Sequence, residues 1–252
     1  MTDRWNRDNY GEPVALCHSK EERARWLALR ANGWGASDAG KLCGLVPYVS
    51  DHAAQRSKTI LAKAFPDAAA KDKESPAMWV GNMLEDKLID RWHERTKHYA
   101  RVDDWSQMLA LPELPWLYVT PDYGGYVAGS NSRYPIEAKV VDPEVHKKYW
   151  KPDNTPPKHV IAQAVLQGWM VRAPAVTVVQ WHWGAWPKDY TVEVKPATVS
   201  WLLTRMEAAW HEVLDLRRQA SDVLNDAAAA GLGAGTVIGT YEAVLEAAEE
   251  FL

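Results

Sequence analysis

The sequence predicts an α/β (α+β) fold in which a central mixed β-sheet is flanked by helices on both faces. Three observations predict this fold. Amphipathic helical segments occupy most of the first hundred residues, short extended segments run from Tyr99 to Val141, and helical spacing then alternates with further extended segments. The chain has 252 residues, which is enough for one well-filled core or at most two small ones.

The composition is that of an ordinary soluble globular domain, with 47% hydrophobic and 25% charged residues. The net charge of −4 and the pI near 6.1 argue against a protein that coats nucleic acid through bulk positive charge. A nuclease is not excluded, because carboxylates that hold a metal make a site locally negative. The fourteen tryptophans, against two phenylalanines, are interpreted mainly as core filling rather than base stacking.

Other kinds of site find little support in the sequence. The two cysteines, Cys17 and Cys43, are too few for a disulfide scaffold, a structural zinc site or an iron–sulfur cluster. His93 and His98 are five residues apart and do not share a helical face, and no glycine-rich phosphate loop is present. The opening MTDRWNRDNYGEP carries no signal-peptide pattern and no segment is apolar enough to span a bilayer, so we expect a cytoplasmic protein without membrane contact.

The first half of the chain predicts four helices. Residues 19–31 begin with a capping-box pattern, Ser19 followed by Glu22, and Ser37 can cap a short helix that stops at Gly44. A third helix is expected over SDHAAQRSKTILAKA, residues 50–64. The fourth starts at the Ser75–Pro76 pair, which is typical of a helix N-terminus, and runs to about residue 98.

The second half predicts strands and three further helices. Short extended runs between residues 99 and 141 are followed by a helix over residues 156–171, a hairpin made of residues 176–184 and 190–194, and an amphipathic helix over residues 199–220. After residue 225 the composition becomes alanine- and glycine-rich and then acidic. We therefore expect a folded domain over residues 1–225, and a hinge and helix over residues 226–252 that contact a subunit or partner.

The candidate site lies in the segment WLYVTPDYGGYVAGSNSRYPIEAKVV. Glu137 and Lys139 are two residues apart in IEAKV, so they share one face of a strand, and Asp122 ends the preceding extended run. The glycine-rich GGYVAGS between them suits a hairpin that returns beside that run. Two hard oxygen ligands suit Mg²⁺ or Mn²⁺, and a lysine can orient an attacking water. The alternative is an exposed Glu–Lys pair on a strand edge, with Asp122 as a turn residue.

Five motifs in one order resemble the phage lambda-type exonucleases, the YqaJ-like viral recombinase branch of the PD-(D/E)xK nuclease superfamily. They are RARWLALRANGWGASDAGKLCGL, WVGNMLEDKLIDRW, VTPDYGG, IEAKVV and HVIAQAVLQGWMV, and together they cover about residues 24–171. The resemblance implies a restriction-endonuclease-like core. One departure is Tyr123, which follows the PD aspartate where the family commonly has glycine; the turn can be shifted by a residue there.

The resemblance also implies roles for single residues. Asp122 and Glu137, with the Ala138 carbonyl and Glu85, would ligate the metal, and Lys139 would position or activate the water. Gln163 would line the site opposite the strands, and Arg30 and Ser37 would bind a terminal 5′-phosphate through the arginine fork and a helix start. From spacing alone, Glu85 could instead be a solvated helix residue, Gln163 an ordinary buried amide, and Arg30 a cation favoured by a helix end.

The function implied by the resemblance is that of a Mg²⁺-dependent exonuclease, with Mn²⁺ as a substitute, that digests double-stranded DNA 5′ to 3′ and leaves 3′ overhangs for phage recombination. A single-strand annealing protein, a ring-shaped trimer and a bacterial host cytoplasm are implied as well. An endonuclease, an exonuclease of opposite polarity and a catalytically inactive DNA-binding or assembly module remain as alternatives. The Trp181–Trp186 segment could stack on DNA, but we interpret it as a hairpin packed on the core or on a subunit partner.

Overall fold

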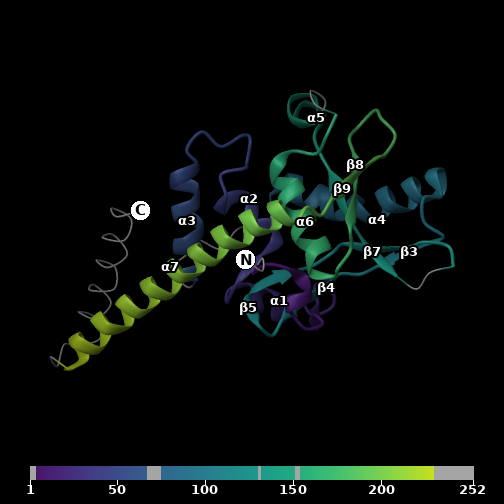
Figure 1. Cartoon of the computed structure of the whole chain (residues 1–252). Coiled ribbons are helices and arrows are strands. Elements are labelled where there is room, and N and C mark those ends of the chain that lie inside the picture. The colour runs from purple at the N-terminus through teal and green to yellow at the C-terminus, as the bar shows by residue number, and fades with distance from the viewer. Residues whose placement is uncertain (1–3, 67–74, 130–131, 151–153, 230–252) are drawn as a thin grey trace.

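The computed structural model describes residues 4–66, 75–129, 132–150 and 154–229 (Figure 1). No helix in these ranges is long and apolar enough to cross a membrane. The elements in chain order are η1 (Arg7–Asn9), β1 (Val14–His18), α1 (Arg23–Arg30), β2 (Trp34–Gly35), η2 (Ala36–Asp38), α2 (Ala39–Leu42), α3 (His52–Ala64), α4 (Pro76–Thr96), β3 (Arg101–Asp104), β4 (Gln107–Leu111), β5 (Leu114–Val119), β6 (Tyr123–Tyr126), β7 (Arg133–Val140), α5 (Pro143–Tyr149), α6 (Lys158–Met170), β8 (Ala175–Trp181), β9 (Lys188–Glu193) and α7 (Pro196–Ala229).

The described strands form two sheets rather than one central sheet. The order of the first is β1-β4-β5-β2, and the order of the second is β3-β6-β7-β8-β9. In the second sheet β7 and β8 run parallel, whereas the other neighbouring pairs run antiparallel. The mixed α/β fold expected from the sequence is therefore confirmed, and its extended region is divided between two sheets.

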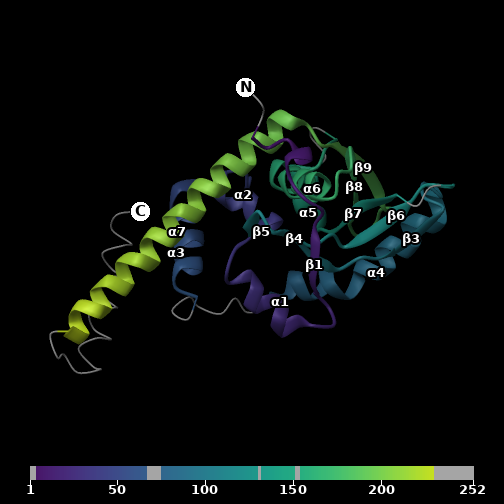
Figure 2. The ribbon, with the colours of Figure 1, turned by 60° about the horizontal axis from the view of Figure 1, so that its bottom comes forward.

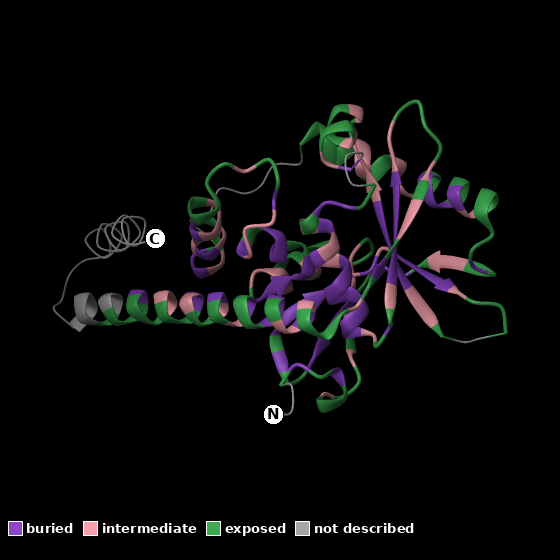
Figure 3. Ribbon diagram, turned by 45° about the horizontal axis from the view of Figure 1, so that its top comes forward, coloured by how far each residue is buried: buried purple, intermediate pink, exposed green. Residues whose placement is uncertain are grey.

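Helices α4 and α6 cover opposite faces of the five-stranded sheet. Leu88 and Trp92 of α4 share an apolar cluster with Ile136 and Ala138 of β7. Because side chains alternate along a strand, Glu137 between them points to the other face, where α6 lies. Strands β7 and β8 are buried along their middle residues, as the purple segments of the sheet in Figure 3 show, so a charged residue there lies in the interior.

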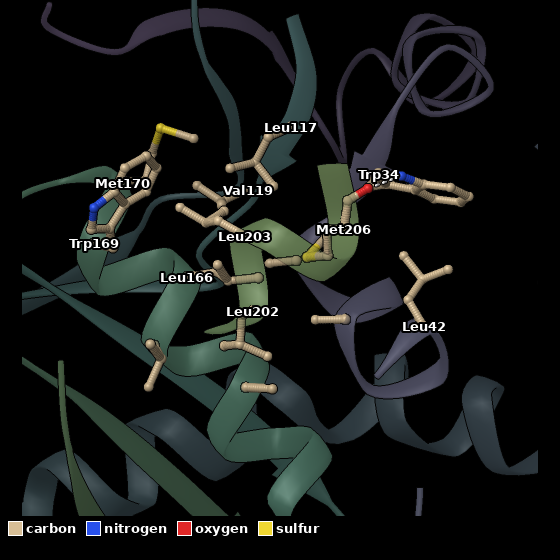
Figure 4. Close-up of a cluster of buried hydrophobic side chains, with 14 of the residues drawn as sticks. Trp34, Leu42, Leu117, Val119, Leu166, Trp169, Met170, Leu202, Leu203 and Met206 are labelled. Carbon is tan, nitrogen blue, oxygen red and sulfur yellow. Dashed lines mark hydrogen bonds between the residues drawn. The ribbon is translucent and has the colours of Figure 1, made fainter. Parts of the chain in front are cut away.

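The largest core cluster joins α2, α6 and the N-terminal half of α7 to β5 (Figure 4). Leu202, Leu203 and Met206 of α7 are completely or almost completely buried in it. The indole N–H of Trp34 donates to the Met206 carbonyl at 3.0 Å. The helix expected over residues 199–220 is thus confirmed but longer, and its far end projects beyond the sheets (Figure 2). The expected hinge begins within α7, and the expected final acidic helix lies outside the described residues.

The prediction of a capping box that begins at Ser19 is wrong. Helix α1 begins only at Arg23, and Glu22 precedes it without a side-chain cap. The Glu22 carboxylate instead accepts the backbone N–H of His18 at 2.9 Å, so it closes the turn before the helix. By contrast, Ser75 caps α4 as expected, because its hydroxyl accepts the Met78 N–H at 3.2 Å.

The expectation that Ser37 caps the short helix is also wrong. Ser37 lies inside the η2 turn, and the Asp38 carboxylate accepts the Gly35 N–H at 2.9 Å. The helical segment still ends as predicted, since Gly44 adopts a positive φ of 65°. Asp38 makes no side-chain cap of α2, and Ser37 lines the neighbouring cavity, where its hydroxyl accepts from Arg30 Nη2.

The sequence predicted that a hairpin returns the IEAKV strand beside the extended run that precedes Asp122, and this pairing is wrong. Strand β7 pairs with β6 and β8, whereas the preceding extended run is β5 of the other sheet. Tyr123, the residue that departs from the family pattern, begins β6 and is buried opposite Ile136. Asp122 therefore lies at the junction of the two sheets rather than within a ladder.

Candidate active site

A cavity of about 510 Å³ opens between α1, η2, α4 and α6. Five of the residues predicted from the sequence line it, namely Arg30, Ser37, Glu85, Asp122 and Gln163. They come from elements far apart in the chain, so the fold alone brings them together. The expected phosphate pocket and the expected acidic centre thus share one cavity.

Glu137 is completely buried behind this cavity and accepts hydrogen bonds on both carboxylate oxygens. Its Oε1 atom receives Lys139 Nζ and, at 2.7 Å, Gln163 Nε2. Its Oε2 atom receives Gln167 Nε2 at 2.6 Å. A buried carboxylate is stable only with such partners, so the structure contradicts the alternative of an exposed strand-edge pair.

Asp122 lies beside Glu137 although the two belong to different segments. Its Oδ2 atom accepts the backbone N–H of Ala138 at 2.9 Å, which ties the β5–β6 junction to β7. Loss of hydration raises the pKa of Asp122 well above its usual range, and the Glu137 and Glu85 carboxylates raise it further. The Ala138 carbonyl as a metal ligand stays a prediction.

Glu85 reaches the same cavity from α4. Burial raises the pKa of its carboxyl, with Lys20 opposing and Glu137 adding to the shift. Lys20 Nζ lies 3.8 Å from Glu85 and 3.1 Å from Asp104. Burial alone would lower the pKa of Lys139, but the Glu137 and Asp122 carboxylates outweigh it and raise that pKa. Carboxylates therefore crowd this end of the cavity and compete for few cations.

Among the described residues, no three His, Cys, Asp or Glu side chains converge closely enough to hold a metal ion. The ligand types nevertheless fit a hard divalent cation, since Asp122, Glu137 and Glu85 all offer carboxylate oxygens. Gln167 Oε1 adds a buried oxygen without a hydrogen-bond partner beside them. A cation near these oxygens would relieve the repulsion that raises the pKa values of Asp122 and Glu85.

Arg30 and Ser37 lie together at another part of the cavity wall. Arg30 Nη2 is 3.3 Å from Ser37 Oγ and 3.2 Å from each carboxylate oxygen of Asp38. The guanidinium also lies over the Trp26 ring, 4.9 Å from its centroid. A planar cation and a hydroxyl side by side can bind the oxygens of a phosphate group.

Three residues of the site were not predicted from the sequence: Lys20, Asp38 and Gln167. Gln167 carried a usable signal, because it follows Gln163 by four residues and so shares its helical face. Lys20 and Asp38 carried none, since their contacts are set by how α1, α3 and α4 pack together. The β8–β9 pairing confirms the predicted hairpin around Trp181–Trp186, but Trp183 and Trp186 are exposed rather than packed on the core. Arg95 lies over the Trp186 ring, 4.0 Å from its centroid, and packing of this segment on a subunit stays a prediction.

The five-stranded mixed sheet carries an acid and a lysine, Glu137 and Lys139, on its central strand β7. The chain belongs to the YqaJ-like viral recombinase family, whose domain model matches residues 25–173. Among curated proteins, no sequence is significantly similar to this chain.

Three solved structures of two proteins share this fold. An alkaline exonuclease (LHK-Exo) from Laribacter hongkongensis has a TM-score of 0.61 at 17% identity, over 79% of this chain and 98% of the other. The same enzyme in complex with dAMP has a TM-score of 0.62 at 16% identity, with the same coverage. A phage-related exonuclease from Haemophilus somnus 129PT has a TM-score of 0.56 at 11% identity, over 74% of this chain and 96% of that one.

Proposed function

We propose that this protein is a Mg²⁺-dependent exonuclease that hydrolyses one strand of duplex DNA from a 5′ end and leaves 3′ overhangs. The observation that supports this most is the shared cavity, which Asp122 and Glu85 line together with Arg30 and Ser37, while the Glu137 carboxylate lies directly behind it, bonded to the lining residue Gln163. The family and the exonuclease names of both structural relatives support the reaction class.

Asp122, Glu137 and Glu85 would hold the metal, which when bound polarises the phosphodiester and lowers the pKa of a water molecule. Lys139 is the residue that positions this water. Because its pKa is raised, it is protonated at neutral pH, which favours orientation of the water and neutralisation of charge on phosphorus over removal of a proton. Gln163 and Gln167 hold the Glu137 carboxylate in place for this task.

Hydrolysis consumes one water and breaks one P–O bond at each step. Arg30 and Ser37 would bind the terminal 5′-phosphate and so set which phosphodiester reaches the carboxylates. Their presence in the same cavity as the acids gives a reason for action at an end rather than within a strand.

The wider setting belongs to the same proposal. A single-strand annealing protein would receive the overhang, and a ring-shaped trimer would keep a chain of net charge −4 on DNA by topology. The setting would be the cytoplasm of a phage-infected bacterium, with residues 1–225 as the nuclease domain and residues 226–252 as a contact for a subunit or partner.

The test uses linear duplex DNA labelled at the 5′ or the 3′ end of one strand, with a closed circular duplex as control, in Mg²⁺ or in EDTA. We expect Mg²⁺-dependent release of the 5′ label while the circle stays intact. Release of the 3′ label first would contradict the polarity, and nicking of the circle would indicate an endonuclease. Binding without cleavage in any metal would indicate an inactive module.

A further inference from the structure

Asp38 is a buried carboxylate that the proposed reaction does not use, and it lies directly behind Arg30. Its side chain is 8% exposed. Both carboxylate oxygens contact Arg30 Nη2 at 3.2 Å, one of them accepts the Gly35 N–H at 2.9 Å, and Lys63 Nζ lies 3.8 Å away. Burial would raise the pKa of Asp38, but the charges of Arg30 and Lys63 outweigh it, so this carboxylate is ionised.

The guanidinium of Arg30 is restrained on several sides. Trp26 covers it, with the ring centroid 4.9 Å away. Gly35 lies so close that a Cβ atom there would stand 3.0 Å from Nη2. Lys63 Nζ donates to the Arg30 carbonyl, which fixes the backbone as well. The side chain is therefore held before any ligand arrives.

The contacts of Arg30 leave donors for a ligand. Among the described residues, the side-chain acceptors of Arg30 are Ser37 and Asp38, and both contact Nη2. A guanidinium has five N–H donors, so Nε and Nη1 retain donors. Arg30 also lines the cavity and its side chain is 25% exposed. The contact with Asp38 thus orients the guanidinium of Arg30 and leaves its Nε and Nη1 donors for a ligand.

The charge of the pocket also permits an anion. Arg30 and Lys63 are two cations beside the single carboxylate of Asp38, and Lys41 is a further cation near it, so positive charge is in excess. Burial lowers the pKa of Lys63 to about 8, so at pH 7 it is still mostly protonated. Asp38 partly neutralises the positive charge of Arg30, and the positive charge of Lys63 compensates for this.

We propose that Asp38, supported by Lys63, is a positioning residue that pre-orients Arg30 and thereby sets the preference of this protein for DNA ends that carry a 5′-phosphate. This inference rests on the proposed function, because it assumes that the cavity receives a DNA end. The gain is entropic: a fixed arginine loses less freedom when it binds a phosphate than a mobile one does.

The test measures equilibrium binding of 5′-phosphorylated and 5′-hydroxyl duplexes by fluorescence anisotropy in EDTA at pH 7, where no strand is cut. The wild type is expected to prefer the phosphorylated end. Asp38→Asn keeps the shape of the side chain and removes its charge, and should reduce that preference about tenfold. Glu212→Gln is the matched control and should leave the preference unchanged, because it removes the carboxylate of another arginine–carboxylate pair, Arg56–Glu212, outside this cavity.

A double-mutant cycle separates positioning from a structural role. If Asp38 acts through Arg30, then Asp38→Asn should have no further effect on the preference in an Arg30→Ala background. An additive effect, an equal loss on both ends, or a wild type without preference would each overturn the inference.

Two further outcomes are separable. Asp38→Asn is replaced by Lys63→Met if circular dichroism shows that it does not fold. Lys63→Met removes one positive charge beside Asp38 while the Arg30–Asp38 contact stays, so it should also weaken the preference for the phosphorylated end. An unchanged preference in Lys63→Met would then overturn the inference. A wild type that prefers phosphorylated ends but cuts no DNA in Mg²⁺ would refute the proposed nuclease and leave the positioning role standing.

Discussion

At the scale of single residues, Glu137 is the point at which the site converges. It is fully buried, and its two carboxylate oxygens accept from three donors of β7 and α6. Oε1 has two of these donors, whereas Oε2 has Gln167 Nε2, so removing Gln167 would leave a buried carboxylate oxygen without its donor, which costs more than an ordinary hydrogen bond. We therefore expect substitution of these donors to lower the activity.

Gln167→Leu tests this directly. It keeps the side-chain volume but removes the donor to Glu137 Oε2, so we expect kcat to fall about tenfold or more. Gln55→Leu on α3 is the control, since it makes the same change away from the cavity. Steady-state kinetics on linear duplex DNA provides the measurement, and equal rates for Gln167→Leu and the control would contradict the role of Gln167.

Asp122→Asn tests the carboxylates as metal ligands without relying on catalysis. The substitution keeps an acceptor for the Ala138 N–H but removes one charge from the cluster. We expect the affinity for Mn²⁺, measured by electron paramagnetic resonance titration, to fall about 10–100-fold. Asp215→Asn, which changes a surface carboxylate of α7, should leave it unchanged. Undiminished binding by Asp122→Asn would mean that the ion binds elsewhere.

The residues of this centre differ in how far the sequence predicts them. Glu137 and Lys139 follow from strand periodicity, because two residues on one face of a strand must share an environment. That Asp122 joins them could be expected only from the order of the motifs, since it reaches Ala138 across a junction between two sheets. Asp38 could not be recognised, because its partner Lys63 comes from α3 and the contact depends on tertiary packing.

At the scale of elements, α6 places the two glutamines, and its distance from the sheet depends on Gly168. A Cβ atom at this position would stand 2.5 Å from Val194 and 2.9 Å from Val176. We therefore expect Gly168→Ala to lower the free energy of unfolding by about 1–3 kcal/mol, because the valines must move. Urea denaturation provides the measurement. Gly81→Ala is the control, since a Cβ atom there meets nothing within 4 Å, and equal losses for both variants would contradict this packing.

Helix boundaries were predictable where a local cap decides them and not elsewhere. Ser75 caps α4 through a contact three residues away, so the sequence alone suffices. The division of the extended region into two sheets was not predictable, because β5 pairs with the short strand β2 and β6 pairs with β3. Such pairings connect residues far apart in the chain, and alternation within a strand does not specify its neighbour.

At the scale of the whole molecule, the pH dependence of the free energy of unfolding is expected to depend on His159 of α6, which packs against Gly40 of α2. Burial lowers the pKa of His159 to about 4. In the unfolded chain it returns to its ordinary value near 6.5, so the unfolded state binds more protons between pH 6.5 and 4. Stability should therefore fall as the pH falls through this window.

His159→Asn removes this titration. The variant should lose some stability at pH 7 through altered packing, but its free energy of unfolding should change less between pH 6.5 and 4 than that of the wild type. Urea denaturation at both pH values gives the comparison. Identical pH dependence in the two proteins would contradict a neutral, buried His159.

Asp122, Glu137 and Lys139 are proposed to form the hydrolytic centre for DNA, and the nuclease function depends on this centre more than on any other part of the molecule. The most direct measurement compares the wild type with Lys139→Ala on linear duplex DNA in Mg²⁺, at protein concentrations that give equal DNA occupancy by anisotropy. We predict that the wild type degrades the duplex and that Lys139→Ala binds it but does not cut it. Equal rates of degradation by the two proteins would contradict a hydrolytic centre that contains Lys139.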